Sequence, residues 1–361
     1  MWSVTSFVCE VPSGAWADTI DRRALLVLSA LVYAAGFSTW MLWPGYPGFL
    51  LGFVLWAVSG AMMSGTFEAL LYDELAAAGA TADYARVTGW AHSAAMTANL
   101  AATVVAAPLF VLGGYQLVGW LSVLVALVHG GLALLLPRAS RSVVVDDAAE
   151  ALAGWARRYV EMLSSGVRET SRVPVVRRVV LVSSAMLGLT AYDEYFPLVV
   201  REQGVETPVV PLFVAMIVVG QAIGTGLAGR TARSTSRRIG WLYGVGAALI
   251  GLGAVSGHPA GLVLIAVGYG LVNNAFIVGQ ARLQESITGP ARATATSVAG
   301  LSSEVFALSV FGFVAMGSLW WSVATAVAVL AIPAIGAAVA AARWLPGPAV
   351  DLSPADDAPG R

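Results

Sequence analysis

The stretch GAWADTIDRR, from Gly14 to Arg23, places two acids and two arginines directly after an apolar run. Charged side chains are costly inside a lipid bilayer, so an apolar run that stops at such a stretch indicates a membrane helix reaching water. A second apolar run begins at Ala24, and positive residues in short loops stay on the cytoplasmic side. The stretch is therefore predicted to be a short cytoplasmic loop between two membrane-spanning helices.

The composition of the whole chain agrees with this prediction. Of 361 residues, 58% are hydrophobic and only 11% are charged, whereas soluble domains are about 45–50% apolar and about 25% charged. All 20 basic residues are arginine. Without lysine the chain has neither a P-loop nor a Schiff-base site for pyridoxal phosphate. No nucleophile, base and orienting group occur together, so we predict that the protein is not an enzyme and uses no cofactor or metal.

Eleven apolar segments are long enough to cross a bilayer, which needs about 20 residues. Nineteen of the 20 arginines lie in alternate loops or in the tail, which predicts a C-terminus in the cytoplasm and Met1 on the outer face of a cytoplasmic (inner) membrane. Because the arginines follow the membrane topology, no nucleic-acid site is predicted. The predicted spans are 1–17, 24–43, 48–72, 87–112, 115–136, 179–200, 208–229, 239–256, 260–283, 293–316 and 319–342.

Short matches recur at an offset of about 210 residues, a pattern typical of transporters built from repeated halves. They pair Gly14 with Gly226, the run from Gly60 with the run from Gly270, and Arg86 with Arg292. The second half then has one helix more, so we expect a parent architecture of six plus six and a chain that lacks the first helix. The predicted regions are an N-terminal bundle at 1–136, a cytoplasmic linker at 137–178, a six-helix bundle at 179–342 and a disordered tail at 343–361. Residues 148–163 of the linker form either an interfacial amphipathic helix or a solvated segment.

With two such halves, the chain resembles the major facilitator superfamily (MFS). The family signature G-x-x-x-D-[RK]-x-G-[RK]-[RK] is matched by Gly14, Asp18, Arg22 and Arg23, while a threonine and an aspartate replace its first basic residue and its glycine. The run from Glu10 to Gly14 and GTFEALLYDEL at 65–75 resemble a bacterial drug-efflux-like branch. The resemblance implies an all-α membrane fold of two pseudo-symmetric bundles, with five plus six helices in this chain, that acts as a monomer on a small molecule.

The resemblance also implies a cytoplasmic gate. Asp18, Arg22 and Asp73 are expected to form an ion cluster that latches the gate, supported by Gly14 and Arg23. By the same resemblance, Asp18 faces the N-terminus of the span that starts near 293, where the helix dipole favours an anion. The alternative is an ordinary loop whose charges only set the orientation.

Acids inside membrane spans are rare, and each is a functional candidate. Burial favours the protonated form of a carboxyl, which is what proton coupling needs. The alternative roles are helix–helix hydrogen bonding or, for the pair in TAYDEYFP, a solvated outer mouth. A histidine in a span either titrates or is simply packed. The candidates for proton coupling or substrate binding are Glu10, Glu68, Glu304, Asp193, Glu194 and His92.

Neutral polar and aromatic residues suggest where a substrate binds. Asn273 and Asn274 either contact the substrate or bridge neighbouring helices. Tyr192 and Tyr195 form either an aromatic wall of the cavity or part of an interfacial belt. Three glycines of GQAIGTG, at 220, 224 and 226, are predicted to be positions of close helix packing.

These features predict a secondary transporter that moves a small amphipathic molecule by alternating access, as proton-coupled efflux. The G-P-x-x-G-G pattern of the family's antiporters is incomplete here, with Pro108 and then Gly113-Gly114, so proton antiport depends on the membrane acids alone. Two alternatives stay open. One is an uptake symporter or permease of the same fold, and the other is a non-transporting protein, either truncated or serving as a sensor or scaffold.

Overall fold

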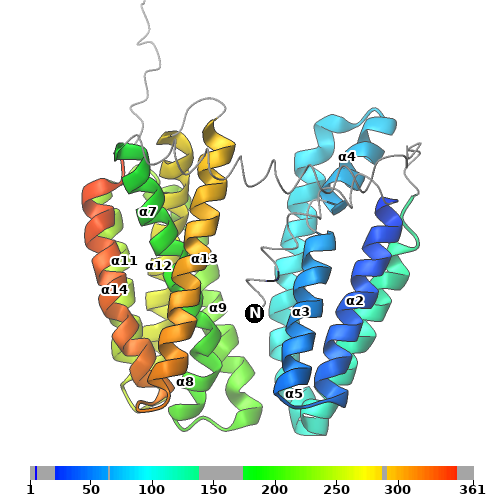
Figure 1. Cartoon of the computed structure of the whole chain (residues 1–361), viewed down its shortest axis with the longest axis horizontal. Helices are drawn as coiled ribbons and strands as arrows, with labels where there is room; N and C mark the ends of the chain where they lie inside the picture. Colours follow the sequence, from blue (N-terminus) through cyan, green and yellow to red (C-terminus); the bar gives the residue numbers. More distant parts are fainter. Residues whose placement is uncertain (1–4, 6–20, 64–65, 138–173, 287–290, 348–361) are drawn as a thin grey trace, which may run out of the picture. The chain divides into compact units, whose positions relative to one another are not determined.

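The computed structural model describes residues 21–63, 66–137, 174–286 and 291–347, together with Thr5. The chain divides into two compact units, Met1–Glu161 and Met162–Arg361, and each is described by itself. All regular elements among the described residues are helices (Figure 1).

The first unit contains α2 (Arg22–Leu42), α3 (Tyr46–Met63), α4 (Thr66–Ala77), the 3₁₀ helix η1 (Thr81–Asp83) and α5 (Tyr84–Ala133). Helix α2 begins where Asp21 caps it, because the Asp21 carboxylate accepts a 2.8 Å hydrogen bond from the backbone N–H of Ala24. The span predicted at 48–72 comprises α3 and much of α4, and α4 extends beyond it to Ala77.

Helix α5 is interrupted within its length. Gly113 and Gly114 leave the helical conformation, and Gly114 has φ 58° and ψ −155°, a backbone region that is essentially restricted to glycine. The two arms of α5 correspond to the spans predicted at 87–112 and 115–136. The glycine pair therefore separates two membrane-length helices, as the sequence suggested.

The second unit contains a longer series of helices. Its first element starts at Pro174 rather than at the predicted 179, so the last residues assigned to the linker are helical. The elements are α7 (Pro174–Gly188), η2 (Leu189–Tyr195), α8 (Phe196–Glu202), η3 (Thr207–Val209), α9 (Val210–Gly226), α10 (Ala228–Thr231), α11 (Ser236–Ala254), α12 (Gly261–Ser286), α13 (Ala291–Gly317) and α14 (Val323–Trp344).

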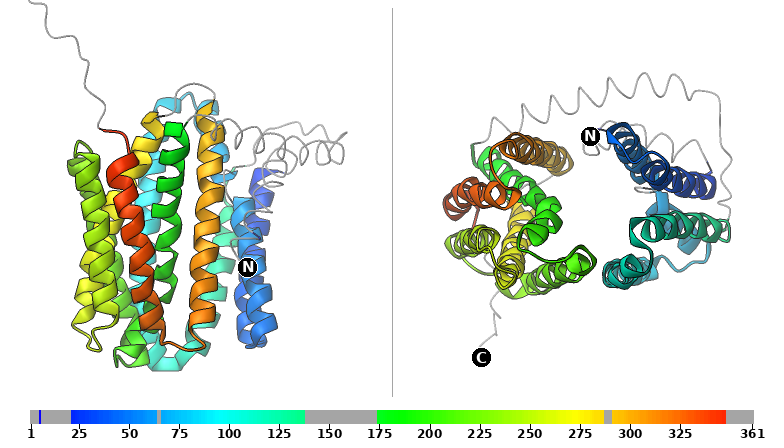
Figure 2. Two further views of the ribbon diagram at one scale, coloured as in Figure 1. Left: turned by 60° about the vertical axis from the view of Figure 1, so that its left-hand side comes forward. Right: turned by 90° about the horizontal axis from the view of Figure 1, so that it is seen from below.

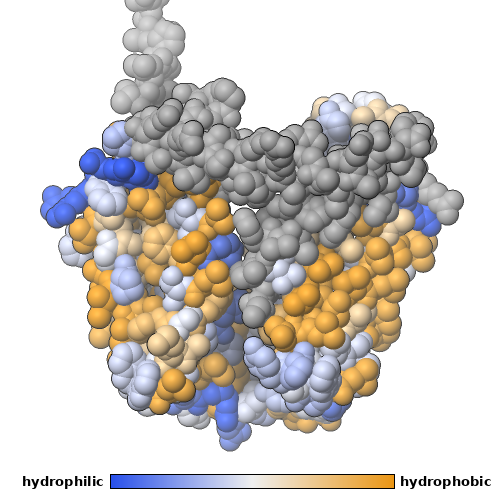
Figure 3. Space-filling model, viewed as in Figure 1, coloured by the Kyte–Doolittle hydropathy of each residue, from blue (hydrophilic) through white to orange (hydrophobic). Residues whose placement is uncertain are grey.

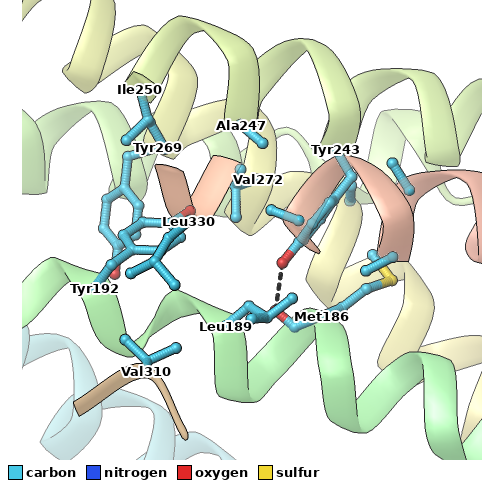
Figure 4. Close-up of a cluster of buried hydrophobic side chains, with 14 of the residues drawn as sticks. Met186, Leu189, Tyr192, Tyr243, Ala247, Ile250, Tyr269, Val272, Val310 and Leu330 are labelled. Carbon is cyan, nitrogen blue, oxygen red and sulfur yellow. Dashed lines mark hydrogen bonds between the residues drawn. The ribbon is translucent and has the colours of Figure 1, made fainter. Parts of the chain in front are cut away.

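Helix α12 lies inside the second unit and contacts α7, α9 and α11, as the end-on view in Figure 2 shows. Helix α14 packs on α11 and α7, and α13 packs on α7. One continuous hydrophobic core joins these helices, with side chains such as Met186, Ile250 and Val272 fully or almost fully buried (Figure 4).

Eight helical stretches of the described residues are long and apolar enough to cross a membrane. Hydrophobic residues cover the length of each unit, whereas hydrophilic residues gather toward the helix ends (Figure 3). Together these features indicate a multi-pass membrane protein.

Candidate functional site

The first span of the second unit is not a continuous α-helix. Between α7 and α8 the chain follows the 3₁₀ helix η2, which shifts the backbone hydrogen-bond pattern in the middle of the span. Just before η2, the Tyr243 hydroxyl on α11 donates a 2.9 Å hydrogen bond to the backbone carbonyl of Met186 (Figure 4). Backbone groups freed at such a break must find partners inside a membrane protein, and Tyr243 supplies one.

Asp193 lies in η2 and is held by a tyrosine from another helix. The Tyr269 hydroxyl on α12 donates a hydrogen bond to the Asp193 carboxylate. Tyr269 is only 4% exposed, and its ring packs edge-on against Phe196 with centroids 5.2 Å apart. The acid is therefore fixed between two helices and does not form a fully solvated mouth.

Two amide side chains extend this contact to α9. Asn273, one turn after Tyr269, donates a 2.9 Å hydrogen bond to the Tyr269 backbone carbonyl. Gln221 then donates a 3.2 Å hydrogen bond to the Asn273 side-chain oxygen. We call Asp193, Tyr269, Asn273 and Gln221 the polar cluster.

Close packing of glycines allows α9 to reach this cluster. A Cβ atom on Gly270 would lie 2.5 Å from the Gly220 carbonyl oxygen, and one on Gly224 would collide with the Gly270 backbone. The prediction of close packing is thus confirmed at Gly220 and Gly224. It is wrong at Gly226, the last residue of α9, which is exposed and where a Cβ atom would meet nothing within 4 Å among the described residues.

The two asparagines bridge helices in the second unit. Both are buried, at 7% exposure for Asn273 and 4% for Asn274. Asn274 accepts a 2.8 Å hydrogen bond from Thr231 and donates a 2.9 Å hydrogen bond to the Gly224 carbonyl. The structure thus has the bridging arrangement that was the alternative to substrate contact.

The aromatic and acidic candidates near η2 separate into buried and accessible groups. Tyr192 is 2% exposed and packs in the hydrophobic core (Figure 4), which is not the position of a cavity wall. Its hydroxyl has no hydrogen-bond partner among the residues that the structure describes. Tyr195 is half-buried beside Phe311, with ring centroids 6.2 Å apart. Glu194 is exposed. Glu304 on α13 is half-buried, and within the described part of the chain its buried Oε2 atom has no hydrogen-bond partner.

In the first unit, Arg22 at the start of α2 forms an ion pair with Asp73 on α4. Arg22 is 8% exposed, and the neighbouring Arg23 donates a 3.1 Å hydrogen bond to the Leu136 carbonyl. These contacts join the predicted loop motif to α4 and to the end of α5. Glu68 and His92 are exposed in this unit. Three further candidates, Glu10, Gly14 and Asp18, lie outside the described residues.

The residues of the polar cluster do not line the two large apolar grooves of the second unit. One of about 600 Å³ runs between α7, α13 and α14 and is lined by apolar side chains, including Phe306, Phe313 and Trp344. Its walls suit lipid chains better than a polar ligand. Among the described residues, no three His, Cys, Asp or Glu side chains gather as metal ligands.

Sequence reasoning gave no role to Tyr269, Tyr243 or Gln221. A tyrosine in an apolar helix resembles any other aromatic residue until its hydroxyl partner is known. One signal was present, because Tyr269 and Asn273 are four residues apart and share one face of a helix.

Comparison with known proteins places these features in a family. Residues 1–305 match the family model of the Major Facilitator Superfamily. The fold is similar to that of a D-xylose–proton symporter, with a TM-score of 0.70, 15% identity and coverage of 96% of this chain and 86% of that one. It is also similar to the nucleoside transporter NupG, with a TM-score of 0.65, 14% identity and coverage of 94% and 88%.

A third similar structure is the peptide transporter POT, with a TM-score of 0.63, 14% identity and coverage of 94% of this chain and 83% of that one. No curated protein matches the chain in sequence. The match over residues 1–305, the helical fold and the membrane-length helices agree with one another. The chain belongs to the Major Facilitator Superfamily and is a membrane transporter of that family.

Proposed function

We propose that the protein is a proton-coupled secondary transporter that exports a small amphipathic molecule by alternating access, with Asp193 as the proton-carrying group. The observation that carries the proposal is the hydrogen bond from Tyr269 to Asp193 at the break between α7 and α8. Acidic side chains at membrane depth mark ion and substrate pathways. Interrupted helices near the bilayer midplane are where transporters bind substrate and coupling ion.

The chemistry follows from what a carboxyl group can do in each protonation state. An ionised Asp193 accepts the Tyr269 hydrogen bond and holds η2 against α12. A protonated Asp193 is neutral and carries its own O–H donor, so it accepts the Tyr269 hydrogen bond less strongly. Protonation of Asp193 thereby weakens the contact between η2 and α12. If these two helices move apart when the transporter changes from one facing state to the other, proton binding is coupled to that change.

Glu304 is the second coupling candidate, because its Oε2 atom is buried without a hydrogen-bond partner among the described residues. The proposed substrate contacts are the exposed acid Glu194 and the half-buried ring of Tyr195, which both lie in η2 with Asp193. Tyr192 is left out of the proposed substrate contacts because it is buried in the core.

The proposed direction of transport rests on the resemblance of residues 10–14 and 65–75 to drug-efflux-like members of the family. Uptake symport is the second candidate, favoured by the similarity of the fold to that of the D-xylose–proton symporter. In either case we propose that the described units are the two bundles of a monomer, with five predicted spans in the first and six in the second.

At the proposed cytoplasmic end of the first unit, we assign the Arg22–Asp73 pair to the gate. The pair ties the start of α2 to α4, and an ion pair is a contact that can break and re-form as helices move. An arginine that is 8% exposed loses its only described carboxylate partner if the pair opens. Opening is therefore unfavourable unless another acid replaces Asp73.

The experiment that tests the proposal uses the full chain in liposomes with a pH-sensitive dye inside. Addition of a transported amphiphile to the wild type should move protons in the direction opposite to the amphiphile for efflux, and in the same direction for uptake. Asp193→Asn should abolish the coupled proton movement. Glu206→Gln, at an exposed acid after α8, is the matched control and should leave it intact. Full proton coupling in Asp193→Asn would refute the assignment.

A further inference from the structure

One backbone group determines which side chains of the polar cluster donate hydrogen bonds and which accept them. The Tyr269 carbonyl can only accept, so the Asn273 amide nitrogen must donate to it, which it does at 2.9 Å. The Asn273 side-chain oxygen therefore faces Gln221 and can only accept. Gln221 must in turn use its amide nitrogen as the donor, at 3.2 Å.

This arrangement leaves the carbonyl oxygen of the Gln221 side chain, Oε1, as an acceptor without a partner among the described residues. The side chain is half-buried. Gln221 lies eleven residues after the start of α9 at Val210, which is about 16 Å along the helix at 1.5 Å per residue. That position is near the middle of a bilayer about 30 Å thick, where water is not generally present to satisfy the oxygen.

Hydroxyl groups of the surrounding segments, such as that of Tyr195, both donate and accept, whereas the accessible charged groups are acceptors only. Glu194 in η2 is exposed. Neither η2 nor α9 contains a basic residue, and α12 contains none before Arg282. A ligand that reaches these segments therefore meets carbonyl and carboxylate oxygens but no cationic side chain from them.

We propose that Gln221 is a specificity-determining residue whose Oε1 atom accepts a hydrogen bond from the transported molecule, so that the substrate class is small amphiphiles with an N–H or O–H donor. The proposal rests on the transport function proposed above and names the substrate chemistry of the same site. It does not depend on which acid carries the proton. Molecules whose donors are methylated cannot make this hydrogen bond and cover Oε1 without giving it a partner, so they bind more weakly.

The test compares matched ligands that differ only in the donor. Binding to the purified full-length chain is measured, without a pH gradient, for three pairs. The pairs are 2-naphthol with 2-methoxynaphthalene, benzamide with its N,N-dimethyl derivative, and phenethylamine with its N,N,N-trimethyl derivative. In at least one pair the wild type should bind the donor-bearing member about 3- to 10-fold more tightly. This ratio corresponds to the net contribution of one ordinary hydrogen bond to the binding free energy. Gln221→Leu and Gln221→Met should bring that ratio close to one.

Thr225→Val is the matched control. Thr225 lies one turn further along the same face of α9, and the substitution also removes a polar group, the hydroxyl. It should keep the wild-type ratio. A ratio compares two ligands on the same protein, so a general loss of stability in a variant cancels. Equal binding of both members in every pair, binding of no donor-bearing member, or an unchanged ratio in both Gln221 variants would overturn the proposal. Failure of Asp193→Asn to affect proton coupling would instead refute the coupling assignment and leave this ratio untouched.

Discussion

Tyr243 on α11 donates its hydroxyl hydrogen to the backbone carbonyl of Met186, two residues before α7 ends at Gly188. The bond joins a neighbouring helix to the place where the first span of the second unit changes from α-helix to 3₁₀ helix. The tyrosine is fully buried, so no water is available to replace it. The change to the 3₁₀ helix that contains Asp193 is therefore stabilised by a hydrogen bond from another helix, α11.

Tyr243→Phe should destabilise the protein by about 1 kcal/mol, because the Met186 carbonyl loses the hydrogen bond that the buried hydroxyl donates. Tyr192→Phe is a closely matched control, since it removes the same atom from a tyrosine that is also buried but whose hydroxyl has no hydrogen-bond partner in the described part of the chain. That control should change stability by no more than about 0.5 kcal/mol or should increase it. Thermal unfolding in detergent measures both, and equal losses in the two variants would contradict the role given to Tyr243.

Tyr269→Phe should weaken proton-coupled transport while leaving the fold intact. The variant keeps the ring that packs on Phe196 and removes only the donor to Asp193. We expect the pH profile of transport to shift, because the ionised carboxylate loses a hydrogen bond that favours it. The rate measured from pH 5 to 9 in liposomes is the readout. An unchanged profile would mean that Tyr269 only packs.

Gly224→Ala should destabilise the second unit by about 1–3 kcal/mol, since the added methyl group collides with the Gly270 backbone. Gly226→Ala, two residues away, adds the same methyl group into open space and should be neutral or stabilising by up to about 1 kcal/mol. Detergent melting curves of the two variants give the comparison. Similar melting temperatures would show that the contact between α9 and α12 is looser than described.

Asp73→Asn should cost about 1–2 kcal/mol, because Arg22 is left largely buried without its carboxylate, although Asp73 itself is partly solvated. Glu74→Gln changes the adjacent acid, which has no ion pair among the described residues, and should be close to neutral. If the pair is part of the gate, Asp73→Asn also slows transport more than its stability loss explains. Transport per folded molecule in liposomes separates the two effects.

Glu202→Gln should lower the melting temperature through α14. The Glu202 carboxylate accepts hydrogen bonds of 2.9 Å and 2.8 Å from the backbone N–H groups of Val323 and Ala324 at the start of that helix. A negative charge at a helix N-terminus also interacts favourably with the helix dipole, so about 0.5–1 kcal/mol should be lost. Glu206→Gln, at an exposed acid four residues later, should have no measurable effect.

The elements of the fold were largely predictable from the sequence. The apolar runs that fall on described residues correspond to helices, whereas the predicted span 1–17 lies almost entirely outside those residues. The glycine pair at 113–114 interrupts α5 as expected, and the loop motif predicted the neighbourhood of Arg22 and Asp73. Transfer of a segment into lipid depends on the sum of its own side chains and on satisfied backbone hydrogen bonds. Both are local properties, so the sequence by itself determined the membrane class, the approximate spans and the division into two halves.

The tertiary structure alone decided which side of each helix faces protein. In a membrane both lipid and helix interior are apolar, so hydrophobic patterning says little about the buried face of a span. Tyr192 is therefore in the core although it precedes Asp193 in the chain, and Gly226 is free although Gly224 is packed. The pairs Asp193–Tyr269 and Gln221–Asn273 join residues 76 and 52 positions apart. Their partners are set by the packing of α7, α9 and α12 against one another, which no local segment of the sequence contains.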